Sequence, residues 1–150
     1  MESIKMEAFN IIGISKKTSN KNQQAAEDIQ ELWDEFQGKK IAENTPGKVD
    51  ENIYAIYTDY EGDHQQPYTV LIGSRVANLD HTPKKMIGRR FKKSNYLKFS
   101  PEGKFPDNVI EQWVRIWNSD IERAYTADLE IYSKNSNDPD NILVDILIAI

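Results

Sequence analysis

One residue type and several sequence patterns are missing from this chain of 150 residues. It contains no cysteine, which excludes disulfides, thiolate catalysis and cysteine-ligated metals. Its hydrophobic runs are short and separated, so none approaches the length of a membrane span. No apolar segment of the kind found in secretory signals follows the first residues, Met1–Lys5. These absences fit a cytoplasmic protein and predict no role at a membrane.

The charge balance is acidic, with 24 Asp and Glu, 19 Lys and Arg, and a net charge of −5. This excess argues against nonspecific nucleic-acid binding by the whole surface. One segment is basic instead, and it contains Lys84, Lys85, Arg89, Arg90, Lys92, Lys93 and Lys98. It is either an anion-binding face or the solvated face and flanks of an antiparallel strand. The second interpretation is favoured because no recognition helix accompanies the segment.

The order of predicted elements occurs twice along the chain. The first half has a strand, a helix and two strands at Phe9–Ser15, Lys21–Gln37, Ile53–Tyr60 and Tyr68–Val76. The second half has the same elements at Met86–Phe99, Pro106–Asn118, Asp128–Tyr132 and Asn141–Ile150. Met86–Phe99 fits either one bent strand or a short hairpin. Gly73 stands alone within its strand, which indicates a bulge.

This repeated order predicts an α+β fold with antiparallel strands rather than a doubly wound parallel sheet. The two strand-helix-strand-strand modules cover about residues 6–77 and 84–150. No composition break or long linker separates them, so residues 1–150 are expected to form a single domain. Two pseudo-symmetric modules of this kind can pack together and leave a central cleft, where small ligands tend to bind.

Known catalytic signatures are missing as well. The two histidines, His64 and His81, both lie in predicted loops. There is no His-Glu helical pair, no phosphate-cradling glycine loop and no serine nucleophile elbow. The sequence therefore predicts neither a metal site nor a cofactor.

Glu130 is the most informative acidic residue. Strand alternation in Asp128–Tyr132 places Leu129 and Ile131 on one face, which we expect to meet the helix Val109–Trp117. Glu130 then points to the opposite face, toward the cleft between the modules. A carboxylate partly desolvated among aromatic side chains should seek a cation, or act as an acid or base with a raised pKa. If that face is open to water instead, Glu130 is merely solvated.

Aromatic residues are frequent near this predicted cleft. They are Tyr54, Tyr57, Tyr60, Tyr68, Tyr96, Tyr125 and Tyr132 in or near strands, with Trp33, Trp113 and Trp117 on helices. A single tryptophan on an apolar helix stripe usually packs in the core. As a group, however, aromatics around one acid are typical of sites that bind organic cations.

An ordered set of segments resembles the GyrI-like small-molecule-binding family, also described as the effector-binding domain of AraC-type and MerR-type regulators. The segments are Asn52–Glu61, Tyr68–Gly73, Trp113 in its helix, Asp128–Tyr132 and the apolar last strand. The resemblance extends from about Phe9 to Ile150. It implies two strand-helix-strand-strand modules with a central ligand cleft.

The resemblance also implies particular site residues. Glu130 matches the acidic residue that meets cationic lipophilic drugs in the family's multidrug-binding regulators. Aromatic residues wall the family's pocket, and the candidates here are Trp33, Phe36, Tyr57, Tyr68 and Trp113. The family's regulators carry a DNA-binding helix-turn-helix before this domain. Only about eight residues precede the first predicted strand here, which suggests a stand-alone member that does not itself bind operator DNA.

Three functions follow from these observations. The favoured one is a binding module for amphipathic aromatic molecules, cations among them, with Glu130 as counter-charge. The second is a hydrolase, because some stand-alone relatives break down reactive cyclopropane-containing toxins with a pocket glutamate, and Glu130 would then be the catalytic base. The third is binding to a protein partner, because the family includes an inhibitor of DNA gyrase.

Overall fold

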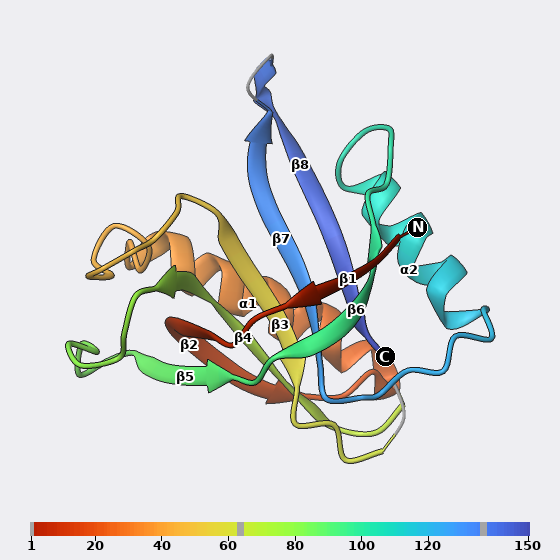
Figure 1. The fold of residues 1–150 in the computed structure, drawn as a ribbon, viewed down its shortest axis with the longest axis horizontal. Coiled ribbons are helices and arrows are strands. Elements are labelled where there is room, and N and C mark those ends of the chain that lie inside the picture. Colours follow the sequence, from red (N-terminus) through yellow and green to blue (C-terminus); the bar gives the residue numbers. More distant parts are fainter. Residues whose placement is uncertain (1, 63–64, 136–137) are drawn as a thin grey trace.

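The computed structural model describes residues 2–62, 65–135 and 138–150, which form one antiparallel sheet and two α-helices (Figure 1). The strands are β1 (Glu2–Met6), β2 (Phe9–Thr18), β3 (Ile53–Thr58), β4 (Tyr68–Val76), β5 (Ile87–Phe91), β6 (Ser94–Phe99), β7 (Ala127–Asn135) and β8 (Asp138–Ala149). The helices are a short 3-10 turn η1 (Lys21–Gln23), α1 (Gln24–Gly38) and α2 (Asp107–Trp117). The predicted α+β class with antiparallel pairing is confirmed. None of the helices in these residues is long and apolar enough to cross a membrane.

The two halves of the chain share this sheet, whose strand order is β1-β6-β8-β7-β3-β4-β2-β5. β2, α1, β3 and β4 form the first half, and β6, α2, β7 and β8 form the second. They join where β3 pairs with β7, and there Ala55 lies opposite Glu130. The uncharged strand of the first half therefore directly borders the strand that carries the acid.

Each of the two edge strands, β1 and β5, pairs with a strand of the other half of the chain. β1 precedes β2 in the chain but pairs with β6, while β5 precedes β6 but pairs with β2. The segment Met86–Phe99 is therefore neither one bent strand nor a hairpin. It contains two strands with different partners, joined at the exposed residues Lys92 and Lys93. Local alternation predicts the extended backbone, but it does not encode which distant strand each piece will pair with. The strand β1 was not predicted at all.

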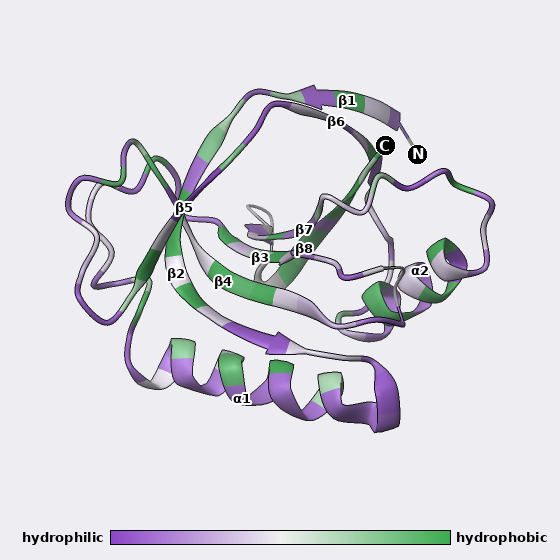
Figure 2. Cartoon of the chain, turned by 90° about the horizontal axis from the view of Figure 1, so that it is seen from below, coloured by the Kyte–Doolittle hydropathy of each residue, from purple (hydrophilic) through white to green (hydrophobic). Residues whose placement is uncertain are grey.

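Both helices lie on the outer face of the curved sheet (Figure 2). The apolar stripe of α1 inserts Leu32 and Phe36 against β4 residues that include Val70 and Ile72. The apolar stripe of α2 is less completely buried. Of its apolar side chains, only Val109 and Ile116 are buried against β8. Several other apolar side chains of α2 stay exposed and are available to line a cavity.

The inner face of the sheet forms a core of its own. The sheet curls so that side chains from all eight strands of the described residues meet in one cluster. Its members include Ile4, Met6, Phe9, Ile11, Tyr54, Ile56, Leu71, Phe91, Tyr96, Leu129 and Leu147. This core ties the two halves together on one face and leaves the opposite face to the helices.

A pair of glycines allows β2 and β4 to approach closely. Gly13 lies opposite Gly73 in a register that runs without interruption from Asn10 to Thr18. A Cβ atom on Gly73 would overlap the carbonyl oxygen of Ile12, and one on Gly13 would overlap that of Ile72. The bulge predicted at Gly73 is therefore wrong. The residue serves close approach of two backbones instead.

Candidate functional site

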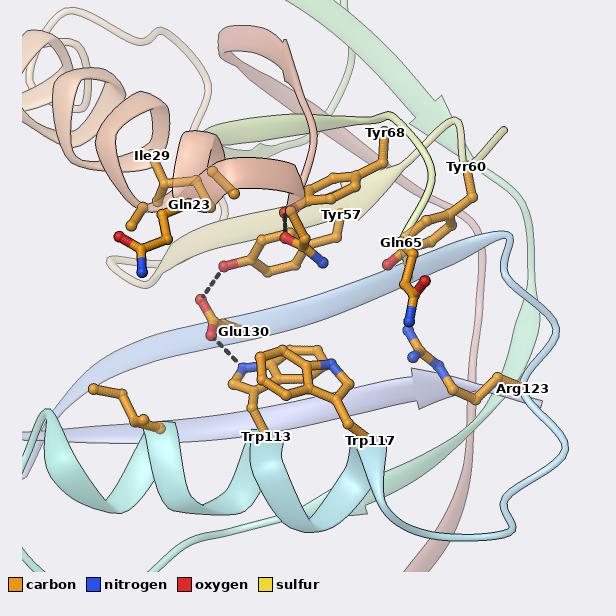
Figure 3. A pocket seen from close by; sticks show the side chains of 14 residues that line it. Gln23, Ile29, Tyr57, Tyr60, Gln65, Tyr68, Trp113, Trp117, Arg123 and Glu130 are labelled. Carbon is orange, nitrogen blue, oxygen red and sulfur yellow. Dashed lines mark hydrogen bonds between the residues drawn. The ribbon is translucent and has the colours of Figure 1, made fainter. Parts of the chain in front are cut away.

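A cavity of about 610 Å³ opens between α1 and α2 on the outer face of the sheet (Figure 3). Its volume lies within the range of small-molecule sites. It is lined by Asn20, Gln23, Ala25, Ala26, Ile29, Tyr57, Tyr60, Gln65, Tyr68, Ile110, Trp113, Trp117, Arg123 and Glu130. Both halves of the chain contribute to this wall, with α1, β3 and β4 on one side and α2 and β7 on the other.

Glu130 points into this cavity, toward the helices. Strand alternation correctly separates it from Leu129, which is completely buried in the inner core. The expectation that Leu129 and Ile131 face the helix Val109–Trp117 is wrong, because that helix packs on β8. The physical reason is the curl of the sheet. It covers the inner face with the sheet's own side chains, so both helices must lie on the face that carries Glu130.

The residue Glu130 is 5 % exposed, and its carboxylate accepts three hydrogen bonds. Its Oε1 accepts from the hydroxyls of Tyr57 at 2.9 Å and Tyr132 at 2.7 Å, and its Oε2 accepts from Trp113 Nε1 at 2.7 Å. Figure 3 shows the carboxylate between Tyr57 and Trp113. All three donors are neutral, and no basic side chain of the described residues forms an ion pair with this acid.

Burial shifts the proton equilibria around Glu130. Desolvation raises the pKa of the Glu130 carboxyl, and the three donated hydrogen bonds only partly oppose that rise. Burial, followed by the charge of Glu130, raises the pKa of the Tyr57 and Tyr132 hydroxyls well above the ordinary tyrosine value. Both tyrosines therefore keep their protons at neutral pH and remain donors to the acid.

Aromatic rings form much of the cavity wall. The rings of Tyr57 and Trp113 meet edge to face at 5.7 Å, and Trp117 follows Trp113 at 6.1 Å. On the other side, Tyr68 lies 6.1 Å from Tyr57 and 5.8 Å from Tyr60. These rings surround the acid with apolar, polarisable surface of the kind that stabilises organic cations.

The residues predicted from the sequence divide into two groups. Glu130, Tyr57, Tyr68 and Trp113 line the cavity. Trp33 and Phe36 lie outside the set of described residues that line it, because they belong to the later turns of α1, while the cavity borders the first turns of this helix. Phe36 is buried between α1 and the sheet. Trp33 packs edge to face on Tyr132 at 5.1 Å, so it supports a hydrogen-bond donor to Glu130 from behind.

A second polar cluster was not predicted as part of the site. Asp128 is completely buried and accepts hydrogen bonds from Tyr60 Oη at 2.6 Å, Arg123 Nη2 at 2.7 Å and the backbone N–H of Ala149 at 2.9 Å. Alternation does place Asp128 on the same face as Glu130. Arg123 comes from a loop without periodicity, and its contact with Asp128, five residues further on, has no local sequence signal.

In the part of the chain that the structure describes, no group of three or more acidic or histidine side chains is placed to bind a metal ion. His81 lies in an exposed turn, remote from the cavity lining. His64 lies outside the described residues.

A curved antiparallel sheet of two related halves carries a cavity between its two helices, and solved structures share this fold over 99 % of the chain. The model of the Cass2 family, integron-associated effector binding protein, matches residues 4–150. The chain belongs to this family, which lies within the GyrI-like group that its sequence resembles.

Individual relatives agree with this membership. YobU of Bacillus subtilis strain 168, whose description proposes a transcriptional regulator, is 30 % identical over 143 residues, covering 92 % of this chain and 89 % of YobU. An integron cassette protein from the mobile metagenome of Vibrio cholerae is 26 % identical with a TM-score of 0.74, over 99 % of this chain and 94 % of that one. SAV2435, solved with tetraphenylphosphonium, shares the fold at 16 % identity and a TM-score of 0.77, over 99 % and 92 %.

Proposed function

We propose that this protein binds amphipathic aromatic cations in the cavity between α1 and α2, with Glu130 as their counter-charge. The observation that carries the proposal is the state of this carboxylate. Glu130 is 5 % exposed and faces a cavity, and among the described residues its carboxylate is held by the neutral donors Tyr57, Tyr132 and Trp113. A ligand that brings a positive charge would supply the partner that the described residues do not provide.

Desolvation of Glu130 favours a cationic ligand. Burial of a carboxylate without a cation is costly, and here that cost is already present before a ligand arrives. A cationic ligand gains the attraction of the acid in a low-dielectric site. Its aromatic groups gain contact with Tyr57, Tyr68 and Trp113, the rings that line the cavity. The cavity therefore favours a large, delocalised cation over a small hydrated one.

Family membership supports a binding role. The family is named for effector binding, and the structurally similar SAV2435 was solved with tetraphenylphosphonium, a lipophilic aromatic cation. The description of YobU proposes a regulator, so a sensor that couples ligand binding to gene regulation through other components is the role we favour.

Matched ligands of opposite charge test the proposal. Tetraphenylphosphonium and tetraphenylborate have nearly the same shape, so calorimetric titration of both separates charge from size. We expect the cation to bind and the anion to bind at least tenfold more weakly. Glu130→Gln should weaken the cation by about 1–3 kcal/mol, the scale of an interaction with a desolvated charge.

A control variant sharpens this test. Glu111→Gln makes the same substitution at an exposed position of α2 outside the cavity lining, and it should leave both affinities unchanged. Equal affinity of the wild-type protein for the two ions, or unchanged cation binding in Glu130→Gln, would contradict the role of Glu130.

One observation also favours a second candidate, the hydrolase. The pKa of the Glu130 carboxyl is raised by its burial, which makes it a stronger base than an exposed glutamate. Incubation with cyclopropane-containing alkylating compounds, followed by mass spectrometry of the products, measures such turnover. Hydrolysis above the buffer rate that disappears in Glu130→Gln would support an enzyme. Binding without turnover across the panel would exclude this candidate.

A further inference from the structure

We propose that Arg123 is a second recognition group of the cavity, and that it selects ligands carrying a carboxylate away from their cationic end. The preferred ligand is then an aromatic zwitterion rather than a simple cation. This inference rests on the proposed function, because Glu130 must hold the positive end. It assigns a different residue to the other end of the same ligand.

The first observation is the position of the guanidinium. Arg123 lines the cavity, and Figure 3 shows it well separated from Glu130 along the pocket. Its partner Asp128 is completely buried and lies outside the described residues that line the cavity. At this end a ligand therefore meets the positive member of the ion pair, while the negative member stays behind it.

The second observation is an incomplete set of hydrogen bonds. Nη2 of Arg123 donates to Asp128 at 2.7 Å, but its enclosed Nε–H has no partner among the described residues. Buried donors without acceptors are rare in folded proteins and cost free energy. The enclosed Nε–H itself does not reach the cavity, but a ligand carboxylate in the cavity would add negative charge beside a guanidinium whose hydrogen bonds to the protein are incomplete.

The third observation is that Arg123 is held in place. Its side chain is 6 % exposed, and its guanidinium lies 4.4 Å from the ring centre of Tyr125 and 6.0 Å from that of Tyr60. Such stacking fixes the plane of the group before a ligand binds. Little conformational freedom remains to be lost on binding, which favours specific recognition.

The two ends together give the cavity an electric polarity. Glu130 and Asp128, the residue that holds Arg123, are two positions apart on β7, or about 7 Å along an extended strand. A carboxylate added to a ligand would normally be repelled by Glu130. Here it can lie against Arg123, whereas a second cation in the same place would be repelled. A pocket that contains both groups therefore tolerates a carboxylate on the ligand, whereas a purely acidic pocket does not.

Two closely related dyes test the inference. Tetramethylrhodamine carries a free carboxylate on its pendant phenyl ring, away from the dimethylamino groups that share its positive charge, and its methyl ester lacks that negative charge. By fluorescence anisotropy at neutral pH, we expect the wild-type protein to bind the zwitterion at least as tightly as the ester. Arg123→Gln should weaken the zwitterion about tenfold or more and the ester much less. Arg115→Gln, an exposed change on α2 outside the lining, should alter neither affinity.

A second variant guards against misfolding, because Arg123→Gln leaves the buried Asp128 without its cation. The double variant Arg123→Gln/Asp128→Asn removes both charges together and should show the same selective loss of the zwitterion. Equal weakening of both dyes, or unchanged selectivity in the double variant, would overturn the inference. Wild-type binding of the ester alone would overturn it while leaving the proposed function standing. Binding of neither dye would count against both.

Discussion

Glu130 and Asp128 lie on the same face of β7, yet only one of the two carboxylates has a cationic partner. Asp128 has a cation, because Arg123 pairs with it at 2.7 Å. Glu130 has only neutral donors, so its buried charge is incompletely compensated. One acid therefore maintains the structure of the wall, while the other holds an unfavourable charge that a ligand can relieve.

Glu130→Gln should consequently stabilise the empty protein at neutral pH, by about 0.5–2 kcal/mol, the usual gain when a functional residue is relieved of strain. The amide can still accept from Trp113 and can donate to a tyrosine hydroxyl. The pKa of Glu130 is raised in the folded state, so the folded protein binds the proton more tightly than the unfolded chain. The destabilisation by its charge is therefore full above the folded-state pKa and is lost as the pH falls to the ordinary value of 4.5 and below.

Urea unfolding of both proteins between pH 4 and pH 8 measures this difference. The advantage of Glu130→Gln should be largest at the alkaline end and should shrink as the pH falls. Glu111→Gln, at an exposed position, should show no comparable trend. A stability difference that is constant with pH, or that favours the wild type at pH 8, would show that the charge of Glu130 is well compensated without a ligand.

At the scale of elements, the close approach of β2 and β4 depends on two glycines. Gly73→Ala should destabilise the protein by about 1–3 kcal/mol, because the new methyl group would meet the carbonyl oxygen of Ile12 and force the strands apart. Gly38→Ala is a matched control at the end of α1, where an added Cβ meets nothing within 4 Å. It should be neutral or slightly stabilising. Equal effects of the two changes in urea unfolding would refute the close-approach explanation.

Local elements were predictable from the sequence because their signals are local. The limits of β4 were predicted at Tyr68–Val76 and are observed there, and both helices are within a few residues of their predicted ranges. The partners of β1 and β5 were not predictable, because short strands with alternating side chains fit several neighbours. The face that the helix Val109–Trp117 covers was misassigned for a related reason: the curl of the sheet, which decides what covers each face, is a property of all strands together.

The basic segment is explained at this scale as well. Part of it is the edge strand β5, where Arg89 forms two hydrogen bonds with Asp59 at 2.6 and 2.7 Å. Lys93 lies 4.0 Å from Glu7, and Lys98 lies 3.8 Å from both Glu2 and Asp145. Nearby acids thus partly neutralise the segment. This arrangement supports the interpretation as the flank of an antiparallel strand.

At the scale of the whole molecule, the shared inner core predicts one cooperative unfolding transition. Both halves supply its side chains, for example Ile56 and Leu129, so neither half can keep its core when the other unfolds. Two tryptophan variants report on the halves separately. Trp33→Phe leaves fluorescence from α2, and Trp113→Phe/Trp117→Phe leaves fluorescence from α1.

In each variant the fluorescence midpoint in urea should coincide with the midpoint by circular dichroism. Each comparison is made within one protein, so differences in stability between the variants do not matter. A fluorescence change that precedes the loss of secondary structure in either variant would show that one half melts independently.

The exchange of the edge strands β1 and β5 between the halves also determines how this molecule can be divided. A cut in the loop after β4 would leave β1 on one piece and its partner β6 on the other, and would likewise separate β5 from β2. The two pieces are therefore complementary parts that regain the fold only by associating.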